Sequence, residues 1–357
     1  MRNHSGKGMI SYNNGDVYEG EFKDAEPHGV GKMTYKDGRI CQGIWQNGMF
    51  IYEGGLDDNG KPHGRGKMMY LDGTYEGEWQ HGKRHGKGTF KERTGNSYEG
   101  GWKDDSRNGK GVEKYPDGSV RYDGEYKNGL MHGKGTYKWP DGDVYEGTFK
   151  NGCIEGKGTH KWADGSSCEG EFKYGKRNGK GTHKRSDGSV LYEGEYKDDK
   201  RHGKGTYNFL NGNVFKGEYR AGKRNGKGVM TYANKDIYDG QWKNDSKDGL
   251  GTMKYHNGDV YEGEFSNNSM HGKGTYTYAA GDISKSIGEW KEGKKFGPFE
   301  NIVRVEVSKK VYYDNDELKP DSNVKHEATW DADTDTEDDN VAQSRRGKRR
   351  KVSLSPS

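Results

Sequence analysis

Hydrophobic and polar residues alternate in short segments that recur along most of this chain. In one clear copy, residues 75–80 read Tyr-Glu-Gly-Glu-Trp-Gln and residues 86–91 read Gly-Lys-Gly-Thr-Phe-Lys. A period of two predicts strands with one aromatic and glycine face and one charged face. The polar residues 81–85 between the two segments are short enough only for a hairpin turn. We call the first segment the leading strand and the second the return strand.

This two-strand unit returns every 23 or 24 residues, as from Tyr75 to Tyr98 and from Tyr98 to Tyr122. A fixed period in this range indicates one supersecondary unit repeated as an array. We therefore predict an all-β protein, an elongated single-layer twisted antiparallel sheet of about a dozen 23-residue β-hairpin repeats. The extra residue of two longer spacings, Arg121 and Leu191, predicts β-bulges. The copies begin at Tyr18, Cys41, Tyr52, Tyr75, Tyr98, Tyr122, Tyr145, Cys168, Tyr192, Phe215, Tyr238 and Tyr261, with a degenerate copy near Ser286.

The glycines share a face with the aromatic residues, so large rings are expected to lie over bare backbone of the neighbouring strand. The opposite face brings Glu of one strand near Lys and Thr of the next. We predict an aromatic groove that serves as core and as candidate binding surface. Its residues are Tyr75, Trp79, Tyr98, Trp102, Tyr122, Tyr145, Tyr192, Tyr238, Trp242 and Tyr261.

The module Tyr-Glu-Gly-Glu-Trp…Gly-Lys-Gly-Thr-Tyr resembles the MORN repeat (membrane occupation and recognition nexus). The resemblance covers roughly residues 6 to 299, in about a dozen in-phase copies. It implies a twisted antiparallel sheet with a groove. Some relatives join such repeats to a lipid kinase or a histone methyltransferase domain, but this sequence leaves no residues for either. The resemblance therefore implies a MORN-only protein without a catalytic domain.

Three segments follow from the pattern: the array at 1–299, C-terminal capping strands at 300–320, and a disordered tail at 321–357. Within the array, the copy at Tyr52 begins only eleven residues after Cys41, and Asn47-Gly48 stands where a return strand is missing. Loss of one strand inverts the direction of everything after it. We therefore expect a discontinuity or a reversed register near residues 46–52.

Composition limits the class of protein. Hydrophobic residues make up 27% of the chain, as in disordered chains, but the 12% aromatic residues at fixed phase predict a folded array. The net charge of +4 is too small to indicate a partner. Cys41, Cys153 and Cys168 lack metal or disulfide spacing and predict reduced thiols of a cytosolic or nuclear protein. No apolar run approaches about 18 residues, so we expect no transmembrane segment.

The repeated polar residues do not predict catalysis. Gly-Lys-Gly-Thr differs from a phosphate-binding loop because a Gly separates Lys from Thr and a strand follows. Paired carboxylates such as Glu76 and Glu78 lie on a regular solvated face, which does not shift pKa values. We therefore predict no enzyme activity, no cofactor and no metal site. The following histidines share one phase of the repeat and are interpreted as turn residues: His28, His63, His85, His132, His202 and His271.

The hairpin turns are basic, whereas the connectors between repeats are acidic. We predict a basic edge as a candidate surface for an acidic peptide or anionic lipid head groups, with purely solubilising loops as the alternative. Its residues are Lys83, Arg84, Lys176, Arg177, Lys200, Arg201, Lys223 and Arg224.

The tail carries a basic block that resembles a nuclear localisation signal, with nucleic-acid or anionic-lipid binding as the alternative. Ser353 and Ser355 follow it as candidate phosphorylation sites. Nucleic-acid binding is expected only through this tail. The block consists of Arg345, Arg346, Lys348, Arg349, Arg350 and Lys351.

Three functions remain open at this point. The first is a non-enzymatic scaffold that binds protein partners along the aromatic groove and charged edges. The second is a peripheral membrane adaptor for phosphoinositides or phosphatidic acid. The third is a stand-alone regulatory subunit of a kinase or chromatin enzyme. We expect a cytoplasmic or nuclear protein, with peripheral membrane association under the second hypothesis and a homodimer as one oligomeric state.

Overall fold

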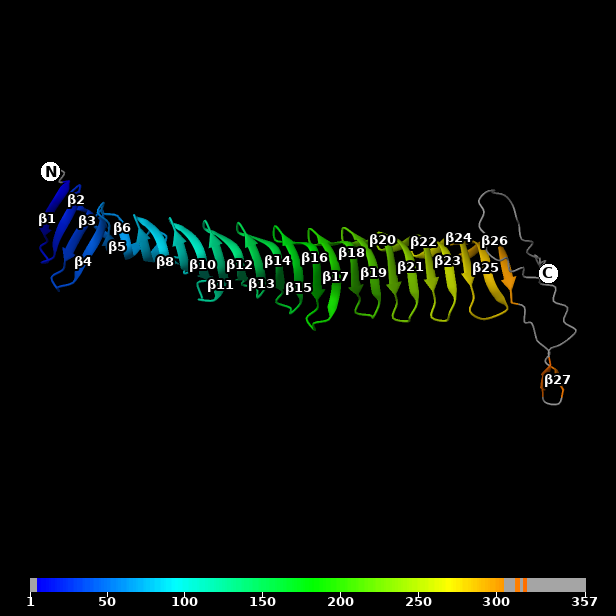
Figure 1. Ribbon diagram of the computed structural model, residues 1–357. Helices are drawn as coiled ribbons and strands as arrows, with labels where there is room; N and C mark the ends of the chain where they lie inside the picture. The colour runs from blue at the N-terminus through cyan, green and yellow to red at the C-terminus, as the bar shows by residue number, and fades with distance from the viewer. Residues whose placement is uncertain (1–4, 305–311, 315–316, 320–357) are drawn as a thin grey trace, which may run out of the picture. The chain divides into compact units, whose positions relative to one another are not determined.

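The computed structural model describes residues 5–304, 312–314 and 317–319. All elements of this part are β-strands, and 26 of them form one open sheet in which each strand pairs antiparallel with the next along the chain (Figure 1). The predicted fold class is confirmed. Among the described residues there is no helix long and apolar enough to span a membrane.

Leading and return strands alternate along most of the sheet. The leading strands are β2 Val17–Lys23, β4 Ile40–Gln46, β5 Met49–Leu56, β7 Gly73–Gln80, β9 Ser97–Lys103, β11 Val120–Lys127, β13 Val144–Lys150, β15 Ser167–Lys173, β17 Val190–Lys197, β19 Val214–Arg220, β21 Ile237–Lys243, β23 Val260–Ser266 and β25 Ile283–Lys291. The return strands are β1 Gly6–Ser11, β3 Glu26–Thr34, β6 Pro62–Met69, β8 Lys83–Glu92, β10 Ser106–Lys114, β12 Leu130–Lys138, β14 Cys153–Lys161, β16 Lys176–Lys184, β18 Lys200–Asn208, β20 Lys223–Thr231, β22 Ser246–Lys254, β24 Ser269–Thr277 and β26 Lys294–Val303.

Two-residue turns close most hairpins. In the turn between β7 and β8, His81 and Gly82 have φ of 49° and 81°. Two consecutive positive φ angles define a turn whose twist matches that of the flanking strands. The two predicted bulges are also present: the pairing of β10 with β11 skips Arg121, and that of β16 with β17 skips Leu191. The extra residue of each longer repeat is therefore absorbed without a change of face.

The hydrogen-bonded ladder continues through residues 46–52, so the sheet has no break there. β4 and β5 are both leading strands, and they pair antiparallel across the Asn47-Gly48 turn. Leading strands therefore run in one direction up to β4 and in the opposite direction from β5 onward. The expected change near residues 46–52 takes the form of this reversal of direction.

The reversal also moves the aromatic face to the other side of the sheet. Trp45 lies opposite Phe50, but Tyr52 lies opposite Ile44, and Ile51 is left over as a bulge. Residues that face each other across a ladder project to the same side, and neighbours along a strand project to opposite sides. Trp45 and Tyr52 are therefore on opposite sides of the sheet.

The buried clusters agree with this exchange of faces. Tyr18, Met33 and Trp45 form one cluster, and Phe50 packs against it. Tyr52 begins a separate cluster, and Ile44 packs against that one. At the reversal, the strand direction inverts while the repeats continue to follow one another along the sheet. Because the repeats have the same handedness, the two parts of the array are related by a half-turn about the long axis of the sheet. That rotation exchanges the two faces.

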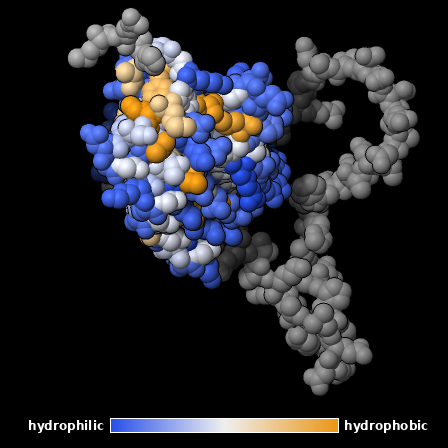
Figure 2. Space-filling view, turned by 90° about the vertical axis from the view of Figure 1, so that its left-hand side faces the viewer, coloured by the Kyte–Doolittle hydropathy of each residue, from blue (hydrophilic) through white to orange (hydrophobic). Residues whose placement is uncertain are grey.

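The N-terminal end of the sheet carries exposed apolar side chains. Figure 2 shows hydrophobic patches at this end, and the exposed large hydrophobic side chains of the first five strands are Met9, Ile10, Ile40 and Met49.

The described C-terminal strands belong to two separate sheets, and the capping role predicted for residues 300–320 stays a prediction. β26 continues the main sheet to Val303. β27 (Tyr312–Asp314) pairs antiparallel with β28 (Glu317–Lys319) in a two-stranded sheet of its own. Residues 305–311 and the predicted tail at 321–357 lie outside the described residues. The contacts of the chain likewise separate residues 1–304 from residues 305–357.

Candidate functional site

The aromatic rings are locked into a closed row. The ring of Tyr75 meets Trp79 and Trp102 edge to face, with centroids 5.0 and 5.2 Å away. Its hydroxyl donates to the carbonyl oxygen of Glu78 at 2.9 Å, and Trp102 Nε1 donates to the carbonyl oxygen of Gly88 at 3.1 Å. Each ring is thus held by the next repeat on one side and by glycine backbone beneath it.

All ten aromatic residues of the predicted groove are core residues, with at most 5% of their surface exposed. Burial raises the pKa of Tyr98 and Tyr145 to about 12, because the charged form is poorly solvated there. A partner would have to open the array to touch these rings. Their burial supports the predicted role as core residues. It does not support their candidate role as a binding surface.

Arginines of the predicted basic edge cover this aromatic row. The guanidinium of Arg84 lies 4.4 Å from the centroid of Trp102, and its Nε lies 3.2 Å from Asp105 Oδ1. Arg177 with Asp199, and Arg224 with Asp245, repeat the same ion pair at 3.2 Å. Arg201 lacks the carboxylate and donates to the carbonyl oxygen of Gly222 at 3.0 Å.

The basic edge is therefore divided in two. Its arginines are half-buried over aromatic rings, where cation–π contact and ion pairing hold them. Its lysines, Lys83, Lys176, Lys200 and Lys223, are exposed. The sequence carried a signal for this division, because Arg84 has the same parity as Gly86, Gly88 and Phe90 and so belongs to the aromatic face.

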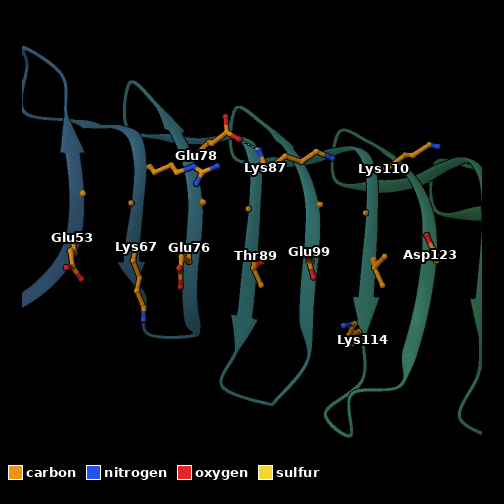
Figure 3. A pocket seen from close by; sticks show the side chains of 18 residues that line it. Glu53, Lys67, Glu76, Glu78, Lys87, Thr89, Glu99, Lys110, Lys114 and Asp123 are labelled. Carbon is orange, nitrogen blue, oxygen red and sulfur yellow. Dashed lines mark hydrogen bonds between the residues drawn. The ribbon is translucent and has the colours of Figure 1, made fainter.

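The charged face of the array is hollowed. A groove of about 1170 Å³ runs across β5–β11, and Figure 3 shows the side chains that line it. A second hollow of about 700 Å³ shares Lys110 and Asp123 with it and continues to Thr159. Together they form what we call the charged groove, from Glu53 to Thr159.

One row of glutamates in the groove is structural. The return strand β8 bulges at Gly86 and Lys87, where the pairing with β7 jumps from His85 to Gly88. Glu78 Oε1 accepts the N–H of Lys87 at 3.1 Å, and Lys87 has no partner in the ladder between β7 and β8. The same bond recurs at Glu125, Glu195 and Glu264, at 3.3, 3.1 and 3.2 Å. These carboxylates close the bulges and are not free to bind a partner.

Two other rows present unpaired charge. A cationic row follows the return strands and consists of Arg65, Lys87, Lys110, Lys134 and Lys157. None of these cations forms an ion pair with a carboxylate of the residues that the structure describes. An acidic row follows the leading strands at one level, as Figure 3 shows for Glu53, Glu76, Glu99 and Asp123, and Glu146 continues it in the second hollow. The groove thus carries a mainly cationic stripe, in which Glu78 and Glu125 lie in register with the cations, and beside it a mainly acidic stripe that Lys67 interrupts.

The six in-phase histidines lie in return strands rather than in turns. Within the described residues, Nδ1 of His28, His85 and His132 is buried without a hydrogen-bond partner. His63 differs, since its ring lies 5.2 Å from that of His81, which is outside the predicted set. All three cysteines are free thiols, and burial raises the pKa of Cys168. The basic block at 345–351 and Ser353 and Ser355 lie outside the described residues.

The MORN repeat family model matches twelve segments of the chain, and it leaves out residues 39–51, where the strand direction reverses. The matched segments are 18–38, 52–74, 75–97, 98–120, 122–144, 145–167, 168–190, 192–214, 215–237, 238–260, 261–283 and 287–298. No curated protein matches the chain in sequence.

Some solved structures share limited similarity. The TCP domain of Drosophila melanogaster SAS-4, in complex with a proline-rich motif of Ana2, is 12% identical over 44% of this chain and 84% of that chain, with a TM-score of 0.29. The wild-type TCP10 domain of Danio rerio CPAP is 9% identical over 84% of this chain and 100% of that chain, with a TM-score of 0.20. At these values neither structure bears on the function of this chain.

Proposed function

The chain belongs to the family of MORN-repeat proteins, and we propose that it is a non-enzymatic scaffold that binds a protein partner along the charged groove. Repeats that contact only their neighbours build long surfaces suited to extended partners. This proposal keeps the scaffold hypothesis and moves the binding surface from the aromatic face to the opposite one.

One observation supports the proposal: the charged groove is a hollow surface, and no cation of its cationic row forms an ion pair with a carboxylate of the described residues. The ten aromatic rings of the predicted groove are at most 5% exposed and already pack within the core. An unpaired row of charge beside a second row of opposite sign favours a partner with the complementary pattern.

The spacing of the rows suggests the form of the partner. Equivalent residues two strands apart are separated by about 9.6 Å. An α-helix repeats every seven residues at about 10.5 Å, so like charges at heptad spacing stay nearly in step with the rows over several repeats. We therefore expect a helical or extended segment with acidic residues along the cationic row and basic residues along the acidic row.

The division of the basic edge weakens the alternative of a lipid adaptor. Arg84, Arg177 and Arg224 are each occupied by a carboxylate and an aromatic ring. The exposed lysines of that edge and Arg201, which lacks a carboxylate, are left to meet phosphoinositides or phosphatidic acid, and exposed single charges bind weakly at physiological salt. A regulatory subunit of a kinase or chromatin enzyme is a special case of the scaffold, decided by which protein binds.

Two sets of variants separate the groove from the edge. In the groove variant, Lys87, Lys110 and Lys134 are changed to Gln; Leu250 occupies the same position in another repeat, so the position tolerates loss of charge. In the edge variant, Lys83, Lys176, Lys200 and Lys223 are changed to Gln.

Each protein is tested by affinity capture with mass spectrometry and by co-sedimentation with phosphatidylcholine vesicles containing phosphatidic acid or phosphoinositide, at two salt concentrations. The proposal predicts that the groove variant loses captured proteins and that the edge variant keeps them. Vesicle binding that is lost in the edge variant, together with unchanged protein capture by the groove variant, would contradict it.

A further inference from the structure

Asp57, His63 and His81 meet at the turn edge of the repeat that follows the reversal. Asp57 begins the turn between β5 and β6, His63 lies in β6, and His81 lies in the turn between β7 and β8. Their potential ligand atoms all lie within 4.8 Å of one another. We propose that these three side chains bind one divalent transition-metal ion, with Zn²⁺ as the best match.

The carboxylate is already oriented for this role. Asp57 Oδ1 accepts the backbone N–H groups of Asn59 and Lys61, both at 3.0 Å, which leaves Oδ2 turned toward His81 Nδ1 at 3.0 Å. Outer hydrogen bonds of this kind fix the orientation of metal ligands.

The donor set selects the class of metal. Two imidazole nitrogens and one carboxylate suit Zn²⁺, and also Cu²⁺ or Ni²⁺, whereas Ca²⁺ and Mg²⁺ prefer oxygen alone. The side chain of Asp57 is only 11% exposed and that of His81 is 67% exposed, so an ion can enter from solvent. Three protein ligands leave a fourth tetrahedral position for water or for a ligand from a partner.

The local sequence explains why the site occurs in this repeat. Tyr52 to His63 spans eleven residues, one more than the ten from Tyr75 to His85, and the longer turn holds Asp57. At the position of His81, several other described turns carry Asn, as at Asn128 and Asn151.

Elsewhere the described residues bring together a His and an Asp without a third ligand. His256 Nδ1 lies 3.0 Å from Asp236 Oδ1, with side-chain exposures of 62% and 14% that resemble those of His81 and Asp57. This pair is a built-in control, because it reproduces two of the three ligands in the same kind of environment.

The test uses the full chain, with ZnCl₂ titrated by calorimetry and Co²⁺ followed by its visible absorption. The ligand variants are His63→Asn and His81→Asn. Asn is native at the equivalent positions, Asn178 and Asn225 for the first and Asn128 and Asn151 for the second, so both variants should fold. Asp57 is left unchanged because its other oxygen holds the turn. His256→Asn and Cys153→Ser are the controls.

We expect one Zn²⁺ that binds about tenfold or more weakly in either ligand variant and unchanged in both controls. Co²⁺ should give a tetrahedral absorption band that is lost with the same two variants. Binding that survives both His63→Asn and His81→Asn, or that disappears with Cys153→Ser, would overturn the proposal.

Discussion

Gly88→Ala tests the packing of aromatic rings on bare backbone. A Cβ at Gly88 would lie 2.2 Å from the Tyr75 hydroxyl oxygen and 2.4 Å from the ring carbon that bears it. Ordinary contact begins near 3.4 Å, so the ring would have to move by about 3.4 − 2.2 = 1.2 Å. Trp79 and Trp102 block that movement on both sides. Gly88 has no positive φ, so the cost is steric rather than conformational.

The magnitude follows from overpacking of a closed core. Inserted methyl groups typically cost about 1–3 kcal/mol of stability. Because the ring of Tyr75 is enclosed on both sides, we expect Gly88→Ala to cost about 3 kcal/mol. Gly181→Ala is the matched control, because Cys168 stands there in place of the tyrosine. A Cβ at Gly181 would lie 3.2 Å from the carbonyl oxygen of Glu169 and 3.5 Å from the ring of Tyr196. We expect that change to stay within about 1 kcal/mol.

Native-state hydrogen exchange measures both changes locally. The loss of protection in Gly88→Ala should centre on β7–β9, since repeats contact only their neighbours. Adding Tyr75→Cys should restore part of it, because it recreates the natural arrangement at Cys168. Equal destabilisation by Gly88→Ala and Gly181→Ala, or a uniform loss of protection along the whole sheet, would refute the reasoning.

Three further predictions concern charge. Arg224→Gln should destabilise its repeat by about 1–2 kcal/mol, because it removes the stacking on Trp242 and the ion pair with Asp245, whereas Lys223→Gln should change the stability by no more than about 0.5 kcal/mol. Urea denaturation measures both variants, and equal effects would contradict the division of the basic edge. Burial raises the pKa of Tyr98 in the folded protein from 10.0 to about 12. The contribution of the neutral Tyr98 side chain to the free energy of unfolding is therefore fully present below pH 10 and is lost as the pH rises through about 12. Tyrosinate absorbance should therefore rise together with unfolding, and core tyrosines that ionise in the folded protein would refute this. A reporter fused to residues 341–357 should accumulate in nuclei and disperse when Lys348–Lys351 are changed to Ala; a salt-sensitive coat on the plasma membrane would instead identify a lipid anchor.

The period-two pattern was sufficient to predict the fold because each repeat is specified locally. Alternation assigned each ring to one face, and turn residues assigned each hairpin. Even the bulges at Arg121 and Leu191 followed from one extra residue. The missing return strand before Tyr52 indicated the reversal of direction in the same way.

The exchange of faces was not predicted, although two residues signal it. Val30 and Ile44 stand where other repeats carry Lys and Glu. They are paired across β3 and β4, on the side that becomes the aromatic side after Tyr52. Apolar residues on a charged face are thus explained by the cluster that begins at Tyr52, against which Ile44 packs.

The candidate sites depended on contacts that periodicity does not encode. Parity alone would assign Arg84 to the aromatic face, but its carboxylate, Asp105, comes from the next repeat. The cluster of Asp57, His63 and His81 likewise requires two turns to lie side by side, and a turn of unusual length escapes a search for in-phase residues. Contacts between the side chains of neighbouring turns could therefore not be predicted from the periodicity of the sequence.

Photo-crosslinking tests most directly whether the charged groove is the binding surface. A benzoylphenylalanine is placed in full-length protein at Thr89 in the groove, at Trp139 on the aromatic side, or at Lys83 on the turn edge, and each protein is crosslinked in cells. The account predicts that the Thr89 probe captures a defined protein, that the other two do not, and that the capture is lost when Lys87, Lys110 and Lys134 are changed to Gln. Capture of that protein from Trp139 or Lys83, with none from Thr89, would contradict it.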